Sequence, residues 1–231
     1  MEQRITEIYD SIRKAASSSN REFGSIRLVA VAKTVSAERI RTAVTYGISA
    51  IGESYIQEAR EKYALLAGIP VSWHFIGHLQ TNKAKYAVKI FDFIHSVDSM
   101  RLVEELDIQA KKINKVQNIL IQVNIGKEDT KSGINEEDAP NLVNEISRFK
   151  NIFLKGLMVI PPFFDDPEKV RPYFSALRNL RERIRSSLYS GPVENISMDE
   201  LSMGMSGDFE AAIEEGATLV RIGTAIFGER G

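Results

Sequence analysis

A lysine at the end of an apolar segment is the first residue of this chain that could do chemistry. Lys33 closes the run RLVAVAK, which has the length and composition of a buried strand. A lysine that is desolvated in such a place has a lowered pKa, and its neutral amine can attack an aldehyde to form an imine. The alternative is an ordinary strand-end lysine whose ammonium group reaches solvent along its alkyl stem. The position alone leaves both interpretations open.

Two later segments have the composition of an anion-binding site. They are SMGMSGD at residues 202–208 and RIGT at residues 221–224. Small residues let backbone N–H groups approach a phosphate, a helix start adds a favourable dipole, and Ser206 and Thr224 each offer a hydroxyl. The alternative is a plain turn in which the glycines only reverse the chain and Ser206 or Asp208 caps the next helix.

The elements that must position these residues alternate between strands and helices. Ile5, Ile8 and Ile12 recur at helical spacing and predict an amphipathic helix before the first strand. Eight apolar runs follow, separated by amphipathic segments. The expected strands are Arg27–Lys33, Ile48–Gly52, Val71–Ile76, Phe91–Val97, Gln117–Asn124, Phe153–Ile160, Ile196–Ser202 and Thr218–Ile222. Ser36 is expected to cap the first helix after a strand, and Asp166-Pro167-Glu168 to begin a later one.

This alternation predicts an α/β protein built as a single (β/α)8 TIM barrel with an extra N-terminal helix. The 231 residues suit one domain over residues 1–231, since such barrels run to about 250 residues. No clear G-x-G-x-x-G follows the first strand, which weighs against a doubly wound nucleotide-binding sheet. In a barrel, functional groups gather at the carboxyl ends of the strands, and phosphate commonly binds after strands seven and eight. Lys33 and the two small-residue loops are therefore expected at the same end of the barrel.

One ligand with an aldehyde and a phosphate would satisfy this arrangement. Pyridoxal 5′-phosphate carries both groups. A barrel enzyme acting on a sugar phosphate, with Lys33 structural, is the third possibility after a cofactor carrier and a pyridoxal-phosphate enzyme.

The composition excludes several other classes of function. With 30 basic and 31 acidic residues and no basic block, the chain is not expected to bind nucleic acid. It contains no cysteine, which excludes disulfides and thiolate metal sites and fits a cytoplasmic protein. The three histidines lack metal-ligand spacing, so no metal is expected. No apolar run approaches the roughly 20 residues of a membrane span, and the N-terminus is too polar for a signal peptide.

Seven stretches of the sequence together carry a resemblance to a known family. They are LVAVAKTVSAERI, IGESYIQEAREK, WHFIGHLQTNKAK, IHSVDS, IQVNIGKEDTKSG, GLMVIPP and LSMGMSGDFEAAIEEGATLVRIGTAIFGER. In this order they resemble the pyridoxal-phosphate homeostasis proteins, which are related to the N-terminal barrel of alanine racemase and are called proline synthase co-transcribed in older usage. The resemblance covers nearly the whole chain, and the last stretch is especially diagnostic.

The resemblance implies roles for five residues. Lys33 would be the Schiff-base lysine, and Ser206, Gly223 and Thr224 would hold the phosphate. Arg221 would approach the pyridine nitrogen, where a guanidinium disfavours protonation and makes the ring a weaker electron sink.

Three further residues are cofactor-binding candidates. Ser54 stands where the family usually has asparagine in a G-E-N-Y motif, so its shorter side chain would contact the cofactor less closely or through a water. His74 is a candidate hydrogen-bond partner near the ring, and Met203 a candidate for the pocket floor. A strand-end histidine that only satisfies a structural hydrogen bond, and a methionine that only packs, are the alternatives.

The function implied is storage and delivery of pyridoxal phosphate inside the cell, without robust catalysis and with no catalytic residue assigned. Apo-forms of pyridoxal-phosphate enzymes are the expected partners, and the chain is expected to be a monomer. The alternative is an amino-acid racemase. A racemase of this family needs a tyrosine base supplied by an additional β domain and the partner subunit, and this chain ends before any such domain.

Overall fold

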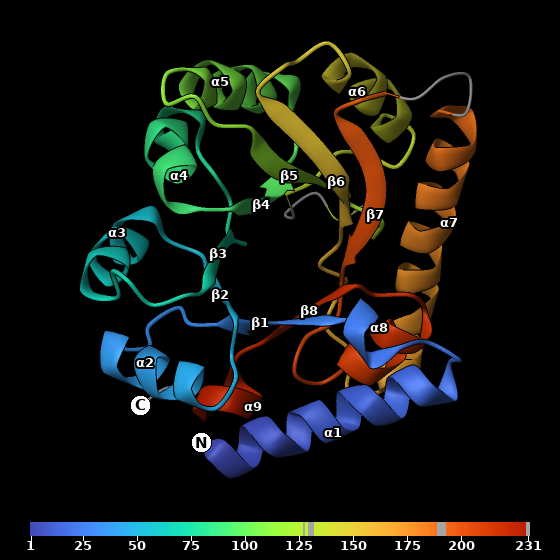
Figure 1. Cartoon of the computed structure of the whole chain (residues 1–231). Coiled ribbons are helices and arrows are strands. Elements are labelled where there is room, and N and C mark those ends of the chain that lie inside the picture. The colour runs from blue at the N-terminus through green and yellow to red at the C-terminus, as the bar shows by residue number, and fades with distance from the viewer. Residues whose placement is uncertain (127, 129–131, 189–192, 230–231) are drawn as a thin grey trace.

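Eight strands pair in parallel and in chain order, and the last closes the sheet on the first (Figure 1). This computed structural model describes residues 1–126, 128, 132–188 and 193–229. The strands are β1 (Arg27–Val31), β2 (Ala50–Glu53), β3 (Ser72–Phe75), β4 (Phe93–Val97), β5 (Gln117–Gln122), β6 (Ile152–Met158), β7 (Ile196–Ser202) and β8 (Leu219–Ile222). The predicted (β/α)8 barrel is confirmed.

Several strands are shorter than the apolar runs that predict them. β1 ends at Val31, and the chain then turns through Thr34, whose φ of 65° lies in the left-handed region. Lys33 is therefore in the loop after the strand instead of at its last position. The apolar composition continues past the end of β1 because Ala32 and Val35, which follow the strand, are buried in the hydrophobic core.

The helices cover the outside of the barrel. They are α1 (Glu2–Ser18), α2 (Ala37–Thr45), α3 (Ile56–Leu65), α4 (Ala84–Ile90), α5 (Met100–Lys111), α6 (Ala139–Ile146), α7 (Arg171–Leu188), α8 (Phe209–Glu214) and α9 (Thr224–Phe227). The extra N-terminal helix is confirmed: α1 buries Ile5, Ile8 and Ile12 and lies along α8 and α9 (Figure 1).

Two predicted helix starts have different outcomes. The Ser36 side chain accepts a hydrogen bond from the Arg39 backbone N–H and caps α2, as predicted. Asp166 caps only the 3-10 turn η3 (Pro167–Lys169), and α7 begins at Arg171. One short turn thus precedes the long helix that the sequence pattern begins at Asp166.

Apolar side chains fill two separate layers. The larger layer lies between the strands and the helices, whereas a smaller cluster takes one residue from each of six strands and lies inside the barrel. Its members are Val29, Ala50, Phe93, Leu120, Met158 and Leu219. Alternate residues of each strand therefore face the lumen, as expected for a small closed barrel.

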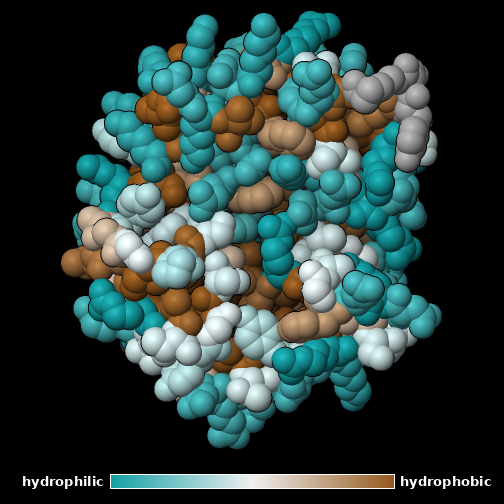
Figure 2. All heavy atoms as spheres, viewed as in Figure 1, coloured by the Kyte–Doolittle hydropathy of each residue, from teal (hydrophilic) through white to brown (hydrophobic). Residues whose placement is uncertain are grey.

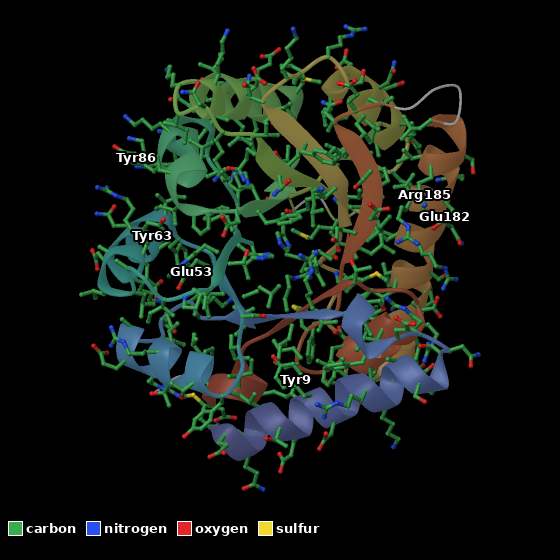
Figure 3. All side chains as sticks on the ribbon, in the orientation of Figure 1. Tyr9, Glu53, Tyr63, Tyr86, Glu182 and Arg185 are labelled. Atoms are coloured by element: carbon green, nitrogen blue, oxygen red, sulfur yellow. The ribbon has the colours of Figure 1, made fainter. Side chains whose placement is uncertain are left out.

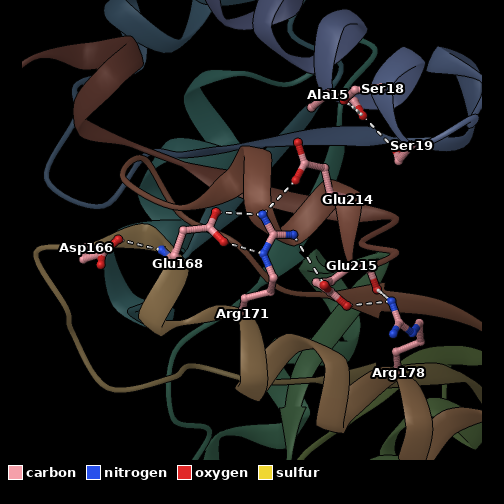
Figure 4. Close-up of polar contacts among 9 residues, drawn as sticks. All are labelled: Ala15, Ser18, Ser19, Asp166, Glu168, Arg171, Arg178, Glu214 and Glu215. Atoms are coloured by element: carbon pink, nitrogen blue, oxygen red, sulfur yellow. Dashed lines mark hydrogen bonds and ion pairs between the residues drawn. The ribbon is translucent and has the colours of Figure 1, made fainter.

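An ion-pair network fixes α8 against α7 (Figure 4). The Arg171 guanidinium contacts Glu168 and Glu214 at 2.8 Å each and Glu215 at 3.4 Å, and Arg178 contacts Glu215 at 2.6 Å. These carboxylates raise the pKa of Arg171. Glu214 and Glu215 lie at the C-terminal end of α8, so the network holds this end of the helix against α7.

The face of the molecule seen in Figure 2 has a hydrophilic rim over much of its circumference. In Figure 2 teal side chains cover most of the rim made by the helices, with brown apolar atoms between them. In the part of the chain that the structure describes, no helix is long and apolar enough to cross a membrane.

Gly156 gives a direct test of the β6–β7 pairing. Its φ is 155°, and a Cβ at this position would lie 1.9 Å from the backbone oxygen of Glu200. We expect Gly156→Ala to lower the free energy of unfolding by about 3 kcal/mol or more, measured by urea denaturation. Gly24→Ala is the control, because no heavy atom lies within 4 Å of its Cβ position. Equal effects of the two substitutions would contradict the strain argument.

Candidate functional site

The loops that follow β1, β6, β7 and β8 enclose a cavity of about 390 Å³. This volume is in the range of small-molecule sites. Its lining combines cationic, hydroxyl and aromatic side chains. The lining residues are Val31, Lys33, Thr34, Val35, Arg39, Pro162, Phe163, Phe164, Met205, Ser206, Gly207, Asp208, Arg221, Gly223, Thr224, Phe227, Gly228 and Glu229.

Five of the predicted site residues line this cavity together. They are Lys33, Ser206, Arg221, Gly223 and Thr224. Their meeting depends on the parallel β1–β8 pairing, in which Ala30 lies opposite Ile222. This register places the loop after β1 beside the loop after β8, although the two are far apart in the sequence.

The loops after β7 and β8 are joined to each other. The Ala225 backbone N–H donates to the Ser206 hydroxyl at 3.5 Å. Gly223 lies close to β1, because a Cβ there would be 3.2 Å from the Cβ of Val31. Within the first loop, the Asp208 carboxylate accepts from the Met205 backbone N–H. Partial burial raises the pKa of Asp208, and this hydrogen bond opposes the rise.

Arg221 is a buried cation that reaches the cavity from inside the barrel. Its side chain donates to the Ser202 hydroxyl at 2.6 Å and to the Val159 carbonyl at 2.9 Å. Burial lowers the pKa of Arg221 to about 10, and nearby Asp208 opposes this shift. The guanidinium therefore stays charged at neutral pH, with two fixed acceptors.

Ser54, His74 and Met203 do not line the cavity. Ser54 follows β2, and its carbonyl oxygen lies 2.2 Å from where a Cβ of Gly77 would be. His74 points into the barrel, where its ring stacks on Phe93 at 5.2 Å. Met203 is fully buried in the larger apolar layer, and Met205 takes the place at the cavity wall. The three predicted contacts therefore lie in three different places: the loop after β2, the lumen and the larger apolar layer.

A buried lysine on α3 holds the backbone just before Lys33. The Lys62 ammonium donates to the Ala32 carbonyl at 2.6 Å and to carboxylates of Glu53 and Glu58 at 2.8 and 2.5 Å. Glu53 is the last residue of β2, and Figure 3 shows it on the side of this strand that faces α3. This Glu53–Glu58–Lys62 cluster, here called the lysine clamp, is hydrogen-bonded to the loop that follows β1 through the Ala32 carbonyl.

The lysine clamp also holds the backbone just after Lys33. The Thr34 backbone N–H donates to the Glu58 carboxylate, which thereby contacts the residue with the left-handed φ. Lys33 is thus carried between two anchored peptide groups. A turn fixed on both sides gives its side chain a defined origin at the cavity wall.

Glu53 is the most perturbed carboxyl of the lysine clamp. It is fully buried, and one of its carboxyl oxygens, Oε2, has no hydrogen-bond partner. Burial raises the pKa of Glu53 to about 7, and the hydrogen bond and charge of Lys62 counteract the rise. The ion pair therefore compensates only part of the desolvation.

The sequence analysis did not predict the lysine clamp or the phenylalanines that line the cavity, which are Phe163, Phe164 and Phe227. The signal for the clamp was Glu58 and Lys62 at i, i+4 spacing in a helix directly after Glu53, a pattern that usually marks only an exposed pair. Phe163, at 84% exposure, lines the cavity from the loop after β6 and had no sequence signal beyond its hydrophobicity.

No cluster of three or more potential metal-binding side chains occurs within residues 1–126, 128, 132–188 and 193–229. The donors around the cavity are an amine, two guanidinium groups, hydroxyls and backbone amides, which suit an anionic organic ligand.

The family model described as alanine racemase, N-terminal domain, matches residues 5–231. Among curated relatives, the pyridoxal phosphate homeostasis protein of Aquifex aeolicus is 43% identical over 228 residues, which are 99% of this chain and 97% of the relative. The protein of the same name from Escherichia coli is 37% identical over 229 residues, covering 98% and 95%.

Solved structures agree with this similarity. PipY of Synechococcus elongatus PCC7942, in a structure with PLP bound, superposes with a TM-score of 0.80 at 34% identity and covers 94% of this chain and 100% of PipY. An unknown protein from Bifidobacterium adolescentis gives a TM-score of 0.85 at 36% identity, covering 98% and 94%.

The lysine clamp predicts a particular pH dependence of stability. The folded protein keeps the Glu53 proton up to about pH 7, whereas the unfolded chain releases it near pH 4.5. Between these values the unfolded state binds fewer protons, so the free energy of unfolding falls as the pH rises. We expect the stability of the wild type, relative to Glu53→Gln, to fall from about pH 5 to about pH 8 in urea titrations.

Glu61→Gln is the matched control, because Glu61 is an exposed glutamate on α3, the helix that carries Lys62. It should keep the wild-type pH dependence. A Glu53→Gln variant with the wild-type slope would show that Glu53 does not titrate in this window.

Proposed function

This chain belongs to the family of alanine racemase N-terminal domains, and from that premise we propose that it binds pyridoxal 5′-phosphate as a Schiff base on Lys33. The protein stores the cofactor and delivers it, which keeps a reactive aldehyde at a controlled concentration. The names of the curated relatives and the PLP-bound structure of PipY support this assignment.

The observation that carries the proposal is the shared cavity of Lys33 and the two small-residue loops. When bound, pyridoxal phosphate supplies an aldehyde that condenses reversibly with an amine, with loss of water. The Lys33 amine would take the aldehyde, and the Ser206 and Thr224 hydroxyls with the Gly223 backbone would take the phosphate. Amine and hydroxyls thus fit the two functional groups of one ligand.

Arg221 would face the pyridine nitrogen. Since its guanidinium is charged and already bonded to Ser202 and Val159, it can donate to that nitrogen but cannot give up a proton near neutral pH. A cation at this place disfavours a proton on the ring nitrogen and so reduces electron withdrawal by the ring. This environment suits holding the cofactor better than activating a substrate carbanion.

The remaining acid–base groups of the cavity support a carrier over a racemase. Besides Lys33, the described lining offers the carboxyls of Asp208 and Glu229 and neither a tyrosine nor a histidine. A racemase needs a second base opposite the lysine. Among the described lining residues only the carboxylates of Asp208 and Glu229 could serve, and Asp208 is already held by the Met205 backbone. Hydrolysis of the imine would return the Lys33 amine and free the aldehyde for a recipient apo-enzyme.

The Lys33 tether is tested by trapping it. We expect the purified protein to take up pyridoxal phosphate with the long-wavelength absorption of an imine, and borohydride to reduce that imine to a secondary amine that peptide mass spectrometry finds on Lys33. Lys33→Ala should lose both the absorption and the adduct. Lys89→Ala, an exposed lysine on α4, is the control and should keep both. An adduct on other lysines alone would overturn the proposal.

A second measurement separates storage from catalysis. With the cofactor bound, we expect turnover of a panel of D- and L-amino acids to stay far below about 1 per second, an ordinary enzyme rate. Isotope exchange at Cα in deuterated water gives a sensitive readout. Racemisation at ordinary enzyme rates, lost in Lys33→Ala, would make the protein a racemase instead.

A further inference from the structure

Polar side chains form a continuous hydrogen-bond chain across the barrel. Arg221, Ser202, His95 and His74 are buried, whereas Ser72 is half-buried and Asp92 is exposed. Ser202 on β7 contacts His95 on β4 at 2.8 Å, and the other ring nitrogen of His95 contacts His74 on β3 at 2.8 Å. At one end Arg221 donates to Ser202. At the other end His74 contacts the hydroxyl of Ser72 at 3.1 Å.

The second end of the chain is a carboxylate. The Ser72 hydroxyl donates to Asp92 at 3.2 Å, and the Trp73 backbone N–H donates to the same oxygen at 2.9 Å. Ser72 begins β3 and Asp92 directly precedes β4, so this end lies at the amino-terminal face of the barrel. Arg221 lines the cavity at the opposite face. The chain therefore runs the height of the barrel.

The two ends determine the direction of every hydrogen bond between them. A guanidinium can only donate and a carboxylate can only accept. Ser202 accepts from Arg221 and gives its one proton to Nδ1 of His95, which must then carry its proton on Nε2. By the same logic Nε2–H of His95 donates to Nδ1 of His74, and Nε2–H of His74 donates to Ser72.

The opposite direction leaves polar atoms unsatisfied. If both histidines carried their protons on Nδ1, the Ser72 hydroxyl would donate to His74 and have no proton for Asp92. The Ser202 proton would then face no acceptor among its described contacts. Asp92 is exposed, so solvent can satisfy its carboxylate, but Ser202 is fully buried. A buried hydroxyl without an acceptor is costly, so the first direction is the stable one.

Burial, together with the charges around the hydrogen-bond chain, keeps both imidazoles neutral. Arg221 from β8 and Arg27 from β1 are the cations that face them, and the carboxylates at the amino-terminal face are Asp92 and the Glu200 partner of Arg27. Burial lowers the pKa of His74 to about 3, with a smaller contribution from Arg27. Burial, the neighbouring His74 and both arginines lower the pKa of His95.

We propose that Ser202, His95 and His74 are positioning residues, which anchor the Arg221 guanidinium through a one-way hydrogen-bond chain to Asp92 and present it to the cofactor as a fixed cation. The role of Arg221 toward a ligand rests on the proposed function. The direction of the hydrogen bonds from Arg221 to Asp92 is a property of the protein alone. His74, which the sequence suggested as a direct ring contact, acts at a distance through His95 and Ser202.

Nitrogen-15 NMR of the protein without added cofactor tests the order of the chain. His78→Gln removes the third histidine of the sequence and leaves only the two buried rings in the spectrum. We expect both rings to show a protonated Nε2 and an unprotonated Nδ1, unchanged from about pH 5 to about pH 8. A proton on Nδ1 of either ring, or protonation of either ring in this range, would overturn the proposal.

Cofactor titration of matched serine variants tests the positioning. Ser202→Ala removes the link to Arg221, and we expect about tenfold weaker pyridoxal phosphate binding and a changed Nδ1 signal of His95. Ser197→Ala is the control on the same strand, because its buried hydroxyl has no partner, and should change neither. Wild-type affinity in Ser202→Ala would overturn the positioning role. Failure of the wild type to bind the cofactor would instead overturn the proposed function. The NMR result would still decide the direction of the hydrogen bonds between Arg221 and Asp92.

Discussion

The parallel pairing of β1 with β8 is the constraint on which the site depends. Closure of the sheet brings the carboxyl ends of all eight strands to one face, and the register that sets Ala30 against Ile222 puts Lys33 beside Gly223 and Thr224. An open sheet of the same strands would leave β1 and β8 free to lie apart. A closed sheet has no unpaired edge strand, so backbone hydrogen bonds between strands, and not contacts between loops, hold the strand ends in place.

Closure also creates a lumen that has to be filled. Six strands contribute an apolar cluster, but the remaining space holds two imidazoles, a serine hydroxyl and a guanidinium. Such a polar interior is tolerated because each group has a partner, and a partly satisfied network would be less stable than an apolar one. The same hydrogen bonds that satisfy the polar groups in the lumen therefore also position the Arg221 guanidinium, which faces the cavity.

The two lysines near the first loop have opposite environments. Lys62 is buried and bound by two carboxylates and a carbonyl, which fixes it as a structural cation. Lys33, two residues past β1, lines the cavity and is partly exposed. Since the peptide groups on both sides of Lys33 are anchored by the lysine clamp, its backbone is rigid while its side chain can reach a ligand. Such a division suits a reversible tether.

The sequence by itself determined the order of the elements and the residues of the mouth. Short apolar runs give the eight strands, and a period-3.6 pattern gives the N-terminal helix. The barrel rule then places Lys33, Ser206, Arg221, Gly223 and Thr224 at one end, because strand ends in a parallel barrel share a face. Local patterns report local conformation, so these predictions needed no knowledge of long-range contacts.

Only the tertiary structure decided which polar side chains meet. Glu58 and Lys62 resemble an ordinary exposed helix pair in the sequence, and His74 resembles a ligand contact, whereas the folded barrel buries Lys62 and His74. The His95–Ser202 contact joins residues 107 positions apart across the lumen. No periodicity encodes such a contact, because which side chains face each other across a barrel depends on the stagger of all eight strands.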